Sequence, residues 1–138
     1  MKIAVSSSES GLKDIVYPVF GRCPAFSIVT VEGKIIKNTD IIPNPGIREG
    51  GGAGIVAAQA VANAGADAVI TGNCGPNALS VLFQAGIKVY SFSGSAENAV
   101  KNLLEGKLSA VTKPGASHFG MGFGGGFGRG RGFRGGRP

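Results

Sequence analysis

The sequence predicts a single α/β domain with a mixed β-sheet of about five strands and about three helices, followed by a basic tail. In the second half of the chain, short apolar stretches alternate with longer segments rich in alanine and leucine, which is the pattern of strands joined by helices. Such an alternation implies right-handed crossovers between parallel strands. A glycine-centred turn between two apolar stretches in the first half adds an antiparallel hairpin, so the sheet is expected to be mixed.

The first half of the domain is expected to consist of strands. Residues 3–5 form a short apolar strand, and residues 26–36 form a hairpin around Gly33, which supplies the positive φ that a tight turn needs. The second arm of the hairpin ends at residues 41–42. The Pro- and Gly-rich stretch 43–52 is predicted to be an irregular, exposed loop.

The second half is expected to alternate helix and strand, with helix ends marked by single residues. Gly65 suits the residue after a helix, Pro76 suits a first helical position, and Ser95 can cap the last helix. In chain order, the predicted elements are a helix at 53–64, a strand at 68–70, a helix at 76–85, a strand at 87–92 and a helix at 95–105.

Charge divides the chain near Lys113. Residues 1–112 carry nine basic and eight acidic side chains, whereas residues 113–138 carry five basic and no acidic ones. The first part is long enough to bury a core without disulfides or structural metal. The second part interleaves phenylalanine and arginine among glycines and is predicted to be disordered.

Composition also excludes several functions. Two cysteines and one histidine, His118, are too few for a zinc finger. The eight acidic residues fall mainly at expected turns and helix ends and form no catalytic cluster, so a metal-dependent nuclease is not expected. A Ser/His/Asp triad is not expected either, because the single histidine lies in the tail. No signal-peptide-like segment and no run of ~20 apolar residues is found, which predicts a cytoplasmic protein with reduced thiols and no membrane contact.

Two glycine-rich turns, each with a cysteine, are predicted to build a binding site from loops. Residues 20–24 read Phe-Gly-Arg-Cys-Pro, and residues 71–78 read Thr-Gly-Asn-Cys-Gly-Pro-Asn-Ala at the junction of a strand and a helix. Ligands of such sheets bind beyond the carboxyl ends of the strands, and the N–H groups at a helix start attract anions. Glycines at 50–54 are expected to let a loop approach the same anion.

The residue types in these turns suggest specific roles. Arg22 is the candidate anion-binding side chain, because a guanidinium makes directional hydrogen bonds to anions. Cys74 is the main candidate metal ligand, because a helix start lowers the pKa of a thiol, and Cys23 is the second. The alternatives are a solvated surface charge for Arg22 and a packed, inert thiol for each cysteine. The other predicted ligand-binding residues are Gly51, Gly52, Gly54, Asn73, Gly75 and Asn77.

The tail suggests a second kind of partner. Arginine and phenylalanine in a glycine matrix are typical of RNA-binding segments of low specificity, which use phosphate contacts and stacking. The alternatives are a solubilising extension or an arm that folds over the anion site. The exposed edge of the hairpin can pair in a dimer, although nothing in the sequence requires one.

Several ordered motifs give the chain a family resemblance. They are residues 1–5, Phe20-Gly21-Arg22 with Pro24 and Phe26, Asn44-Pro45, Gly52-Ala53-Gly54-Ile55, Gly72-Asn73 with Gly75-Pro76-Asn77-Ala78, and residues 85–90. Over roughly residues 1–112 the chain resembles the dinitrogenase iron-molybdenum cofactor biosynthesis family, relatives of the accessory proteins that bind and ferry nitrogenase cofactor precursors. The resemblance implies a ribonuclease H-like fold, no enzymatic activity and, in some members, binding of an iron- or molybdenum-containing sulfide cluster.

The chain departs from the family pattern in two ways. Val19 stands where some members have a histidine, which removes an imidazole ligand. Cys23 and Cys74 stand at positions that are expected often to hold other residues in the family, and each offers a thiolate to a soft metal as part of a different ligand set. The leading hypothesis from sequence is therefore a non-enzymatic carrier of an anionic iron- or molybdenum-sulfide cluster or its precursor. The alternative is an RNA-associated protein that binds through its tail.

Overall fold

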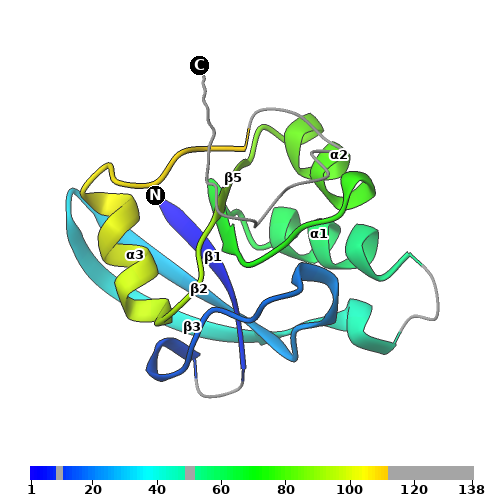
Figure 1. The fold of residues 1–138 in the computed structure, drawn as a ribbon, viewed down its shortest axis with the longest axis horizontal. Helices are drawn as coiled ribbons and strands as arrows, with labels where there is room; N and C mark the ends of the chain where they lie inside the picture. Colours follow the sequence, from blue (N-terminus) through cyan, green and yellow to red (C-terminus); the bar gives the residue numbers. More distant parts are fainter. Residues whose placement is uncertain (9–10, 49–51, 112–138) are drawn as a thin grey trace.

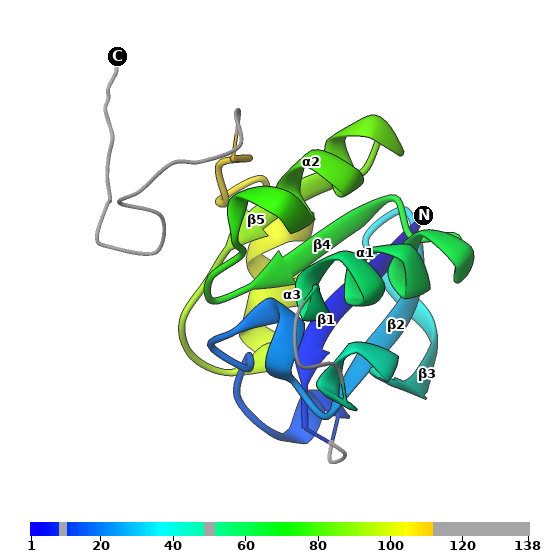
Figure 2. The same ribbon diagram turned by 90° about the vertical axis from the view of Figure 1, so that its right-hand side faces the viewer.

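The computed structural model describes residues 1–8, 11–48 and 52–111, which form a five-stranded sheet with helices on both faces (Figures 1 and 2). The elements, in chain order, are β1 (Lys2–Ser7), η1 (Gly11–Lys13), η2 (Phe20–Arg22), β2 (Ala25–Glu32), β3 (Ile35–Pro43), η3 (Pro45–Arg48), α1 (Ala53–Asn63), β4 (Ala68–Thr71), α2 (Pro76–Gln84), β5 (Lys88–Ser91) and α3 (Ala96–Leu104), where η marks a 3₁₀ turn. The predicted α/β class, with five strands and three helices, is confirmed.

The sheet is mixed, as the sequence predicts. Its strand order is β3-β2-β1-β4-β5. Strand β2 runs antiparallel to its two neighbours β1 and β3, whereas β1, β4 and β5 run parallel. The central strand β1 is buried along its length except at Lys2, because helices cover it on both sides. The carboxyl ends of the three parallel strands therefore meet at one edge of the domain.

The core has two layers, one on each face of the sheet. Helices α1 and α2 pack on one face through side chains such as Val61, Leu79 and Leu82, and α3 packs on the other through Ala99 and Val100. Small side chains on α1 let it lie close to the strands, and fully buried aliphatic side chains fill both layers.

The local signals for turns and helix ends are confirmed. Gly33, Gly65 and Gly86 all have the positive φ expected of a hairpin turn or of the residue after a helix. Pro76 stands in the first turn of α2. The hydroxyl of Ser95 accepts a hydrogen bond of 3.3 Å from the Asn98 N–H and so caps α3.

Two parts of the first half differ from the prediction. Strand β3 continues to Pro43. Its register against β2 shifts in the middle, where Thr30 pairs with Asn38 and Val31 pairs with Ile36. Lys37 between them has no partner on β2 and forms a β-bulge. The described part of the predicted irregular loop forms the 3₁₀ turn η3, and Asn44 just before it is buried instead of exposed.

Some predictions concern residues that the structure does not describe. Gly51 and the tail lie outside the described residues, and so do the expected disorder and RNA binding of that tail. Within the described ranges, no helix has the length and apolar character needed to cross a membrane.

Candidate functional site

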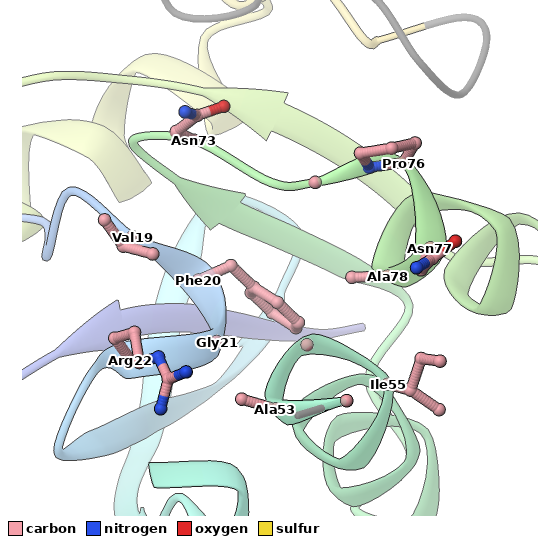
Figure 3. Close-up of a pocket in the computed structure, with 13 residues that line it drawn as sticks. Val19, Phe20, Gly21, Arg22, Ala53, Ile55, Asn73, Pro76, Asn77 and Ala78 are labelled. Carbon is pink, nitrogen blue, oxygen red and sulfur yellow. The ribbon is translucent and has the colours of Figure 1, made fainter. Parts of the chain in front are cut away.

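A pocket of about 400 Å³ lies beyond the carboxyl end of β4, between the turn η2 and the first turns of α1 and α2 (Figure 3). This is the edge of the sheet at which the sequence predicts a ligand. The lining residues are Val19, Phe20, Gly21, Arg22, Gly52, Ala53, Gly54, Ile55, Asn73, Gly75, Pro76, Asn77 and Ala78.

The segment before η2 crosses the ends of all three parallel strands and brings η2 to the pocket. We call residues 14–20 the strap. Its backbone is hydrogen-bonded to residues at or just beyond the carboxyl ends of β1, β4 and β5. These bonds run from the Tyr17 N–H to Ser6 O (2.8 Å), from the Phe20 N–H to Asn73 O (2.9 Å) and from the Val16 N–H to Gly94 O (2.7 Å). The strap therefore fixes one wall of the pocket to the sheet.

Two glycines allow the segments that line the pocket, η2, α1 and α2, to pack closely together. A Cβ on Gly21 would lie 2.9 Å from the Gly54 nitrogen and 3.0 Å from its Cα, and a Cβ on Gly54 would lie 3.1 Å from the Ala78 Cβ. Any larger residue at Gly21 would push η2 away from α1. The turn η2 is thus held close to the main chain of α1, and α1 is held close to the small side chain of Ala78 on α2.

Two helices begin at this pocket without a side-chain cap. The residue before α1 is Gly52 and the residue before α2 is Gly75, and neither can offer a side-chain acceptor to the first-turn N–H groups. By contrast α3, on the other face of the sheet, is capped by Ser95. The first N–H groups of a helix carry partial positive charge and need acceptors. Both helix starts therefore present hydrogen-bond donors suited to an anion.

Arg22 is the only charged side chain among the described residues that line the pocket. It extends from η2 on the side opposite Asn77 of α2, and the Phe20 ring lies between them (Figure 3). A guanidinium and the N–H groups at two helix starts are all groups that attract anions.

The cysteines do not behave as the sequence analysis predicts. Neither Cys23 nor Cys74 lines the pocket, since both are buried in the core layer beneath α1 and α2. Burial raises the pKa of each thiol from 9.0 to about 12. The expected lowering of the pKa of Cys74 by the helix start is therefore wrong, because burial removes the thiol from water and disfavours the charged thiolate.

No conventional metal site is present in the part of the chain that the structure describes. There, no group of three or more histidine, cysteine, aspartate or glutamate side chains lies close enough together to hold a metal ion.

The structure brings most of the predicted ligand-binding residues to one place. Arg22 and Asn73 line the pocket together with Gly52, Gly54, Gly75 and Asn77, whereas Gly51 lies outside the described residues. The predicted ligand-binding residues do not include Asn44, although Asn44-Pro45 is one of the motifs that carry the family resemblance. The sequence offers no local signal that the Asn44 side chain supports the turn of Arg22.

Comparison with known proteins adds independent information. The model of the family described as "Dinitrogenase iron-molybdenum cofactor" matches residues 1–106. The chain is 42% identical over 109 residues to the uncharacterized protein MJ0580 of Methanocaldococcus jannaschii, an alignment that covers 78% of this chain and 89% of that protein.

Solved structures with the same architecture include two with substantial sequence identity. The apo form of the orange protein from Desulfovibrio gigas has a TM-score of 0.76 and 34% identity, and the match covers 82% of this chain and 94% of that one. The NMR structure of TM1290 from Thermotoga, described as a NifB candidate, has a TM-score of 0.67 and 30% identity, with coverage of 79% and 91%.

Proposed function

The chain belongs to the dinitrogenase iron-molybdenum cofactor family, and we propose that its domain binds and carries an anionic iron- or molybdenum-sulfide cluster, or a precursor of one, without catalysing a reaction. The observation that carries this proposal is the convergence of two uncapped helix starts and Arg22 on one pocket. Main-chain N–H groups and a guanidinium are the donors that bind anions in proteins.

The size and chemistry of the pocket favour a cluster over a small oxyanion. A volume of about 400 Å³ is more than one tetrahedral oxyanion needs. Apolar side chains, among them Val19, Phe20 and Ile55, form much of the lining. A sulfide-rich anion is larger and softer than phosphate, so it suits walls that combine apolar surface with a few hydrogen-bond donors.

The proposed mode of binding is non-covalent. Under this proposal the metal keeps its sulfide ligands, and Arg22 with the first N–H groups of α1 and α2 binds the anion from outside. In this mode the thiols of Cys23 and Cys74 do not act as ligands, since burial raises the pKa of each to about 12 and disfavours the thiolate that a metal needs. The relative from Desulfovibrio gigas is consistent with this function. Its structure is described as the apo form of the orange protein, and the word apo implies that another form of that protein has a bound group.

Reconstitution tests the proposal directly. Full-length protein is purified anaerobically and incubated with iron, molybdate and sulfide, and its metal content and visible spectrum are measured before and after. We expect stoichiometric metal and a charge-transfer band, and we expect Cys74→Ser to retain both. A colourless, metal-free protein would refute cluster binding, whereas loss of metal in Cys74→Ser alone would replace the non-covalent mode with thiolate ligation.

A further inference from the structure

Asn44 holds together the turn that carries Arg22. Its side-chain amide donates hydrogen bonds to Gly21 O (3.2 Å) and Cys23 O (2.9 Å), the carbonyl groups on either side of Arg22. Its Oδ1 accepts a hydrogen bond of 2.9 Å from the Gly46 N–H. Asn44 is only 2% exposed, so these bonds form out of contact with water and are costly to lose.

Several other backbone groups of the turn also have partners. The Arg22 N–H donates to Val19 O at 3.2 Å, and the Cys23 thiol donates to Phe20 O at 3.3 Å. Each carbonyl group from Val19 to Gly21 therefore accepts a hydrogen bond, as does that of Cys23. A turn with its polar groups satisfied in this way has little reason to adopt a second conformation.

Asn44 also connects this turn to the first residue of α1. Its partner Gly46 lies in η3, and a Cβ on Gly46 would overlap the carbonyl oxygen of Ala53. The backbone of η3 is thus packed directly against the start of α1. Through Asn44, the turn η2 and the start of α1 are fixed relative to each other, and both line the pocket.

We propose that Asn44 is a positioning residue that sets the Arg22 turn against the start of α1, so that the guanidinium and the helix N–H groups act on one anion. The ligand part of this inference rests on the proposed function. The effect of Asn44 on the turn does not, and it is measurable in the protein without any ligand.

The first experiment measures amide hydrogen exchange in the ligand-free protein. Asn44→Ser removes the amide without adding charge, and Asn44→Asp keeps the shape and the acceptor but loses both donors.

Ser27→Ala is the control, because Ser27 is also buried and its hydroxyl is hydrogen-bonded to that of Ser7 (3.0 Å), but it does not line the pocket. After correction for global stability, we expect exchange at the Arg22 N–H to rise about tenfold in both Asn44 variants and not in the control. Unchanged exchange in whichever Asn44 variant folds would overturn the proposal.

The second experiment asks whether Asn44 acts through Arg22. Tetrathiomolybdate is titrated into the wild type, Asn44→Ser, Arg22→Ala and the double variant. We expect Asn44→Ser to weaken binding about tenfold in the wild type and less than about twofold in the Arg22→Ala background, since coupled residues are not additive. Equal losses in the two backgrounds would refute a positioning role. If the wild type does not bind the probe, tetrathiomolybdate is not a ligand of the pocket, and the exchange experiment alone decides the role of Asn44.

Discussion

Arg22 is the residue on which anion binding is expected to depend most. A charge-assisted hydrogen bond contributes about 1.5–3 kcal/mol, so Arg22→Ala should weaken tetrathiomolybdate binding by at least about tenfold. Lys101→Ala is the matched control, because Lys101 is an exposed cation on α3, on the other face of the sheet. Spectrophotometric titration at fixed salt measures both. An equal loss in the two variants would show that net charge, and not the pocket, attracts the anion.

The two thiols also lead to a prediction about stability and pH. Their pKa values are near 9 in the unfolded chain and about 12 in the folded one, so the folded state binds more protons between these values. Their contribution to the free energy of unfolding is therefore complete below pH 9 and is lost as the pH rises from 9 towards 12. Denaturant unfolding of the wild type and of Cys74→Ala measures this. The variant should lose stability less steeply in that range, and parallel curves would contradict the assignment.

At the level of elements, we expect the uncapped start of α2 to lower the stability of the protein and to leave its first N–H groups available to a ligand. Gly75 has a φ of −67°, and a Cβ there would meet nothing within 4 Å, so Gly75→Asp is sterically allowed. Its carboxylate would accept first-turn N–H groups and stabilise the protein by about 1 kcal/mol. The same charge would occupy the donors of the pocket, so tetrathiomolybdate binding should fall.

Removing the cap of α3 is the control for adding a cap to α2. Ser95→Ala removes a hydrogen bond at a helix start that does not line the pocket, so it should cost about 1 kcal/mol of stability and leave binding unchanged. Chemical denaturation and titration are run on both variants. Unchanged or tighter binding in Gly75→Asp would mean that the α2 start does not contact the ligand.

Elements with local signals were the ones that the sequence predicted well. Gly33, Gly65 and Ser95 mark ends that depend on the φ or the side chain of one residue, and the structure has these ends where they were expected. The strap has no such signal, because its position depends on hydrogen bonds to residues up to about 80 positions away in sequence. The direction of the Cys74 side chain was missed for the same reason, since burial is decided by distant packing.

At the level of the whole molecule, the distribution of charge assigns anion binding and RNA binding to different parts of the chain. The first 112 residues are nearly balanced in charge, whereas all five charged side chains of the remaining 26 residues are positive. If the tail binds RNA, as its composition predicts, truncation after Thr112 should abolish salt-sensitive RNA binding and leave tetrathiomolybdate binding unchanged. Filter binding at two salt concentrations and titration of the same preparations measure this. Undiminished RNA binding by the truncated chain would rule out the tail as the RNA-binding segment.

The bulge at Lys37 has a consequence for how the molecule behaves in concentrated solution. Strand β3 is an outer strand of the sheet, and Ile35, Ile36 and Ile41 on it are exposed, which is a combination that invites another chain to add a strand. A bulged lysine interrupts the regular edge and places a charge there. Deleting Lys37 should restore a continuous edge and cause concentration-dependent aggregation, which light scattering detects. We therefore expect the register shift at Lys37 to limit the pairing of β3 with strands of other chains.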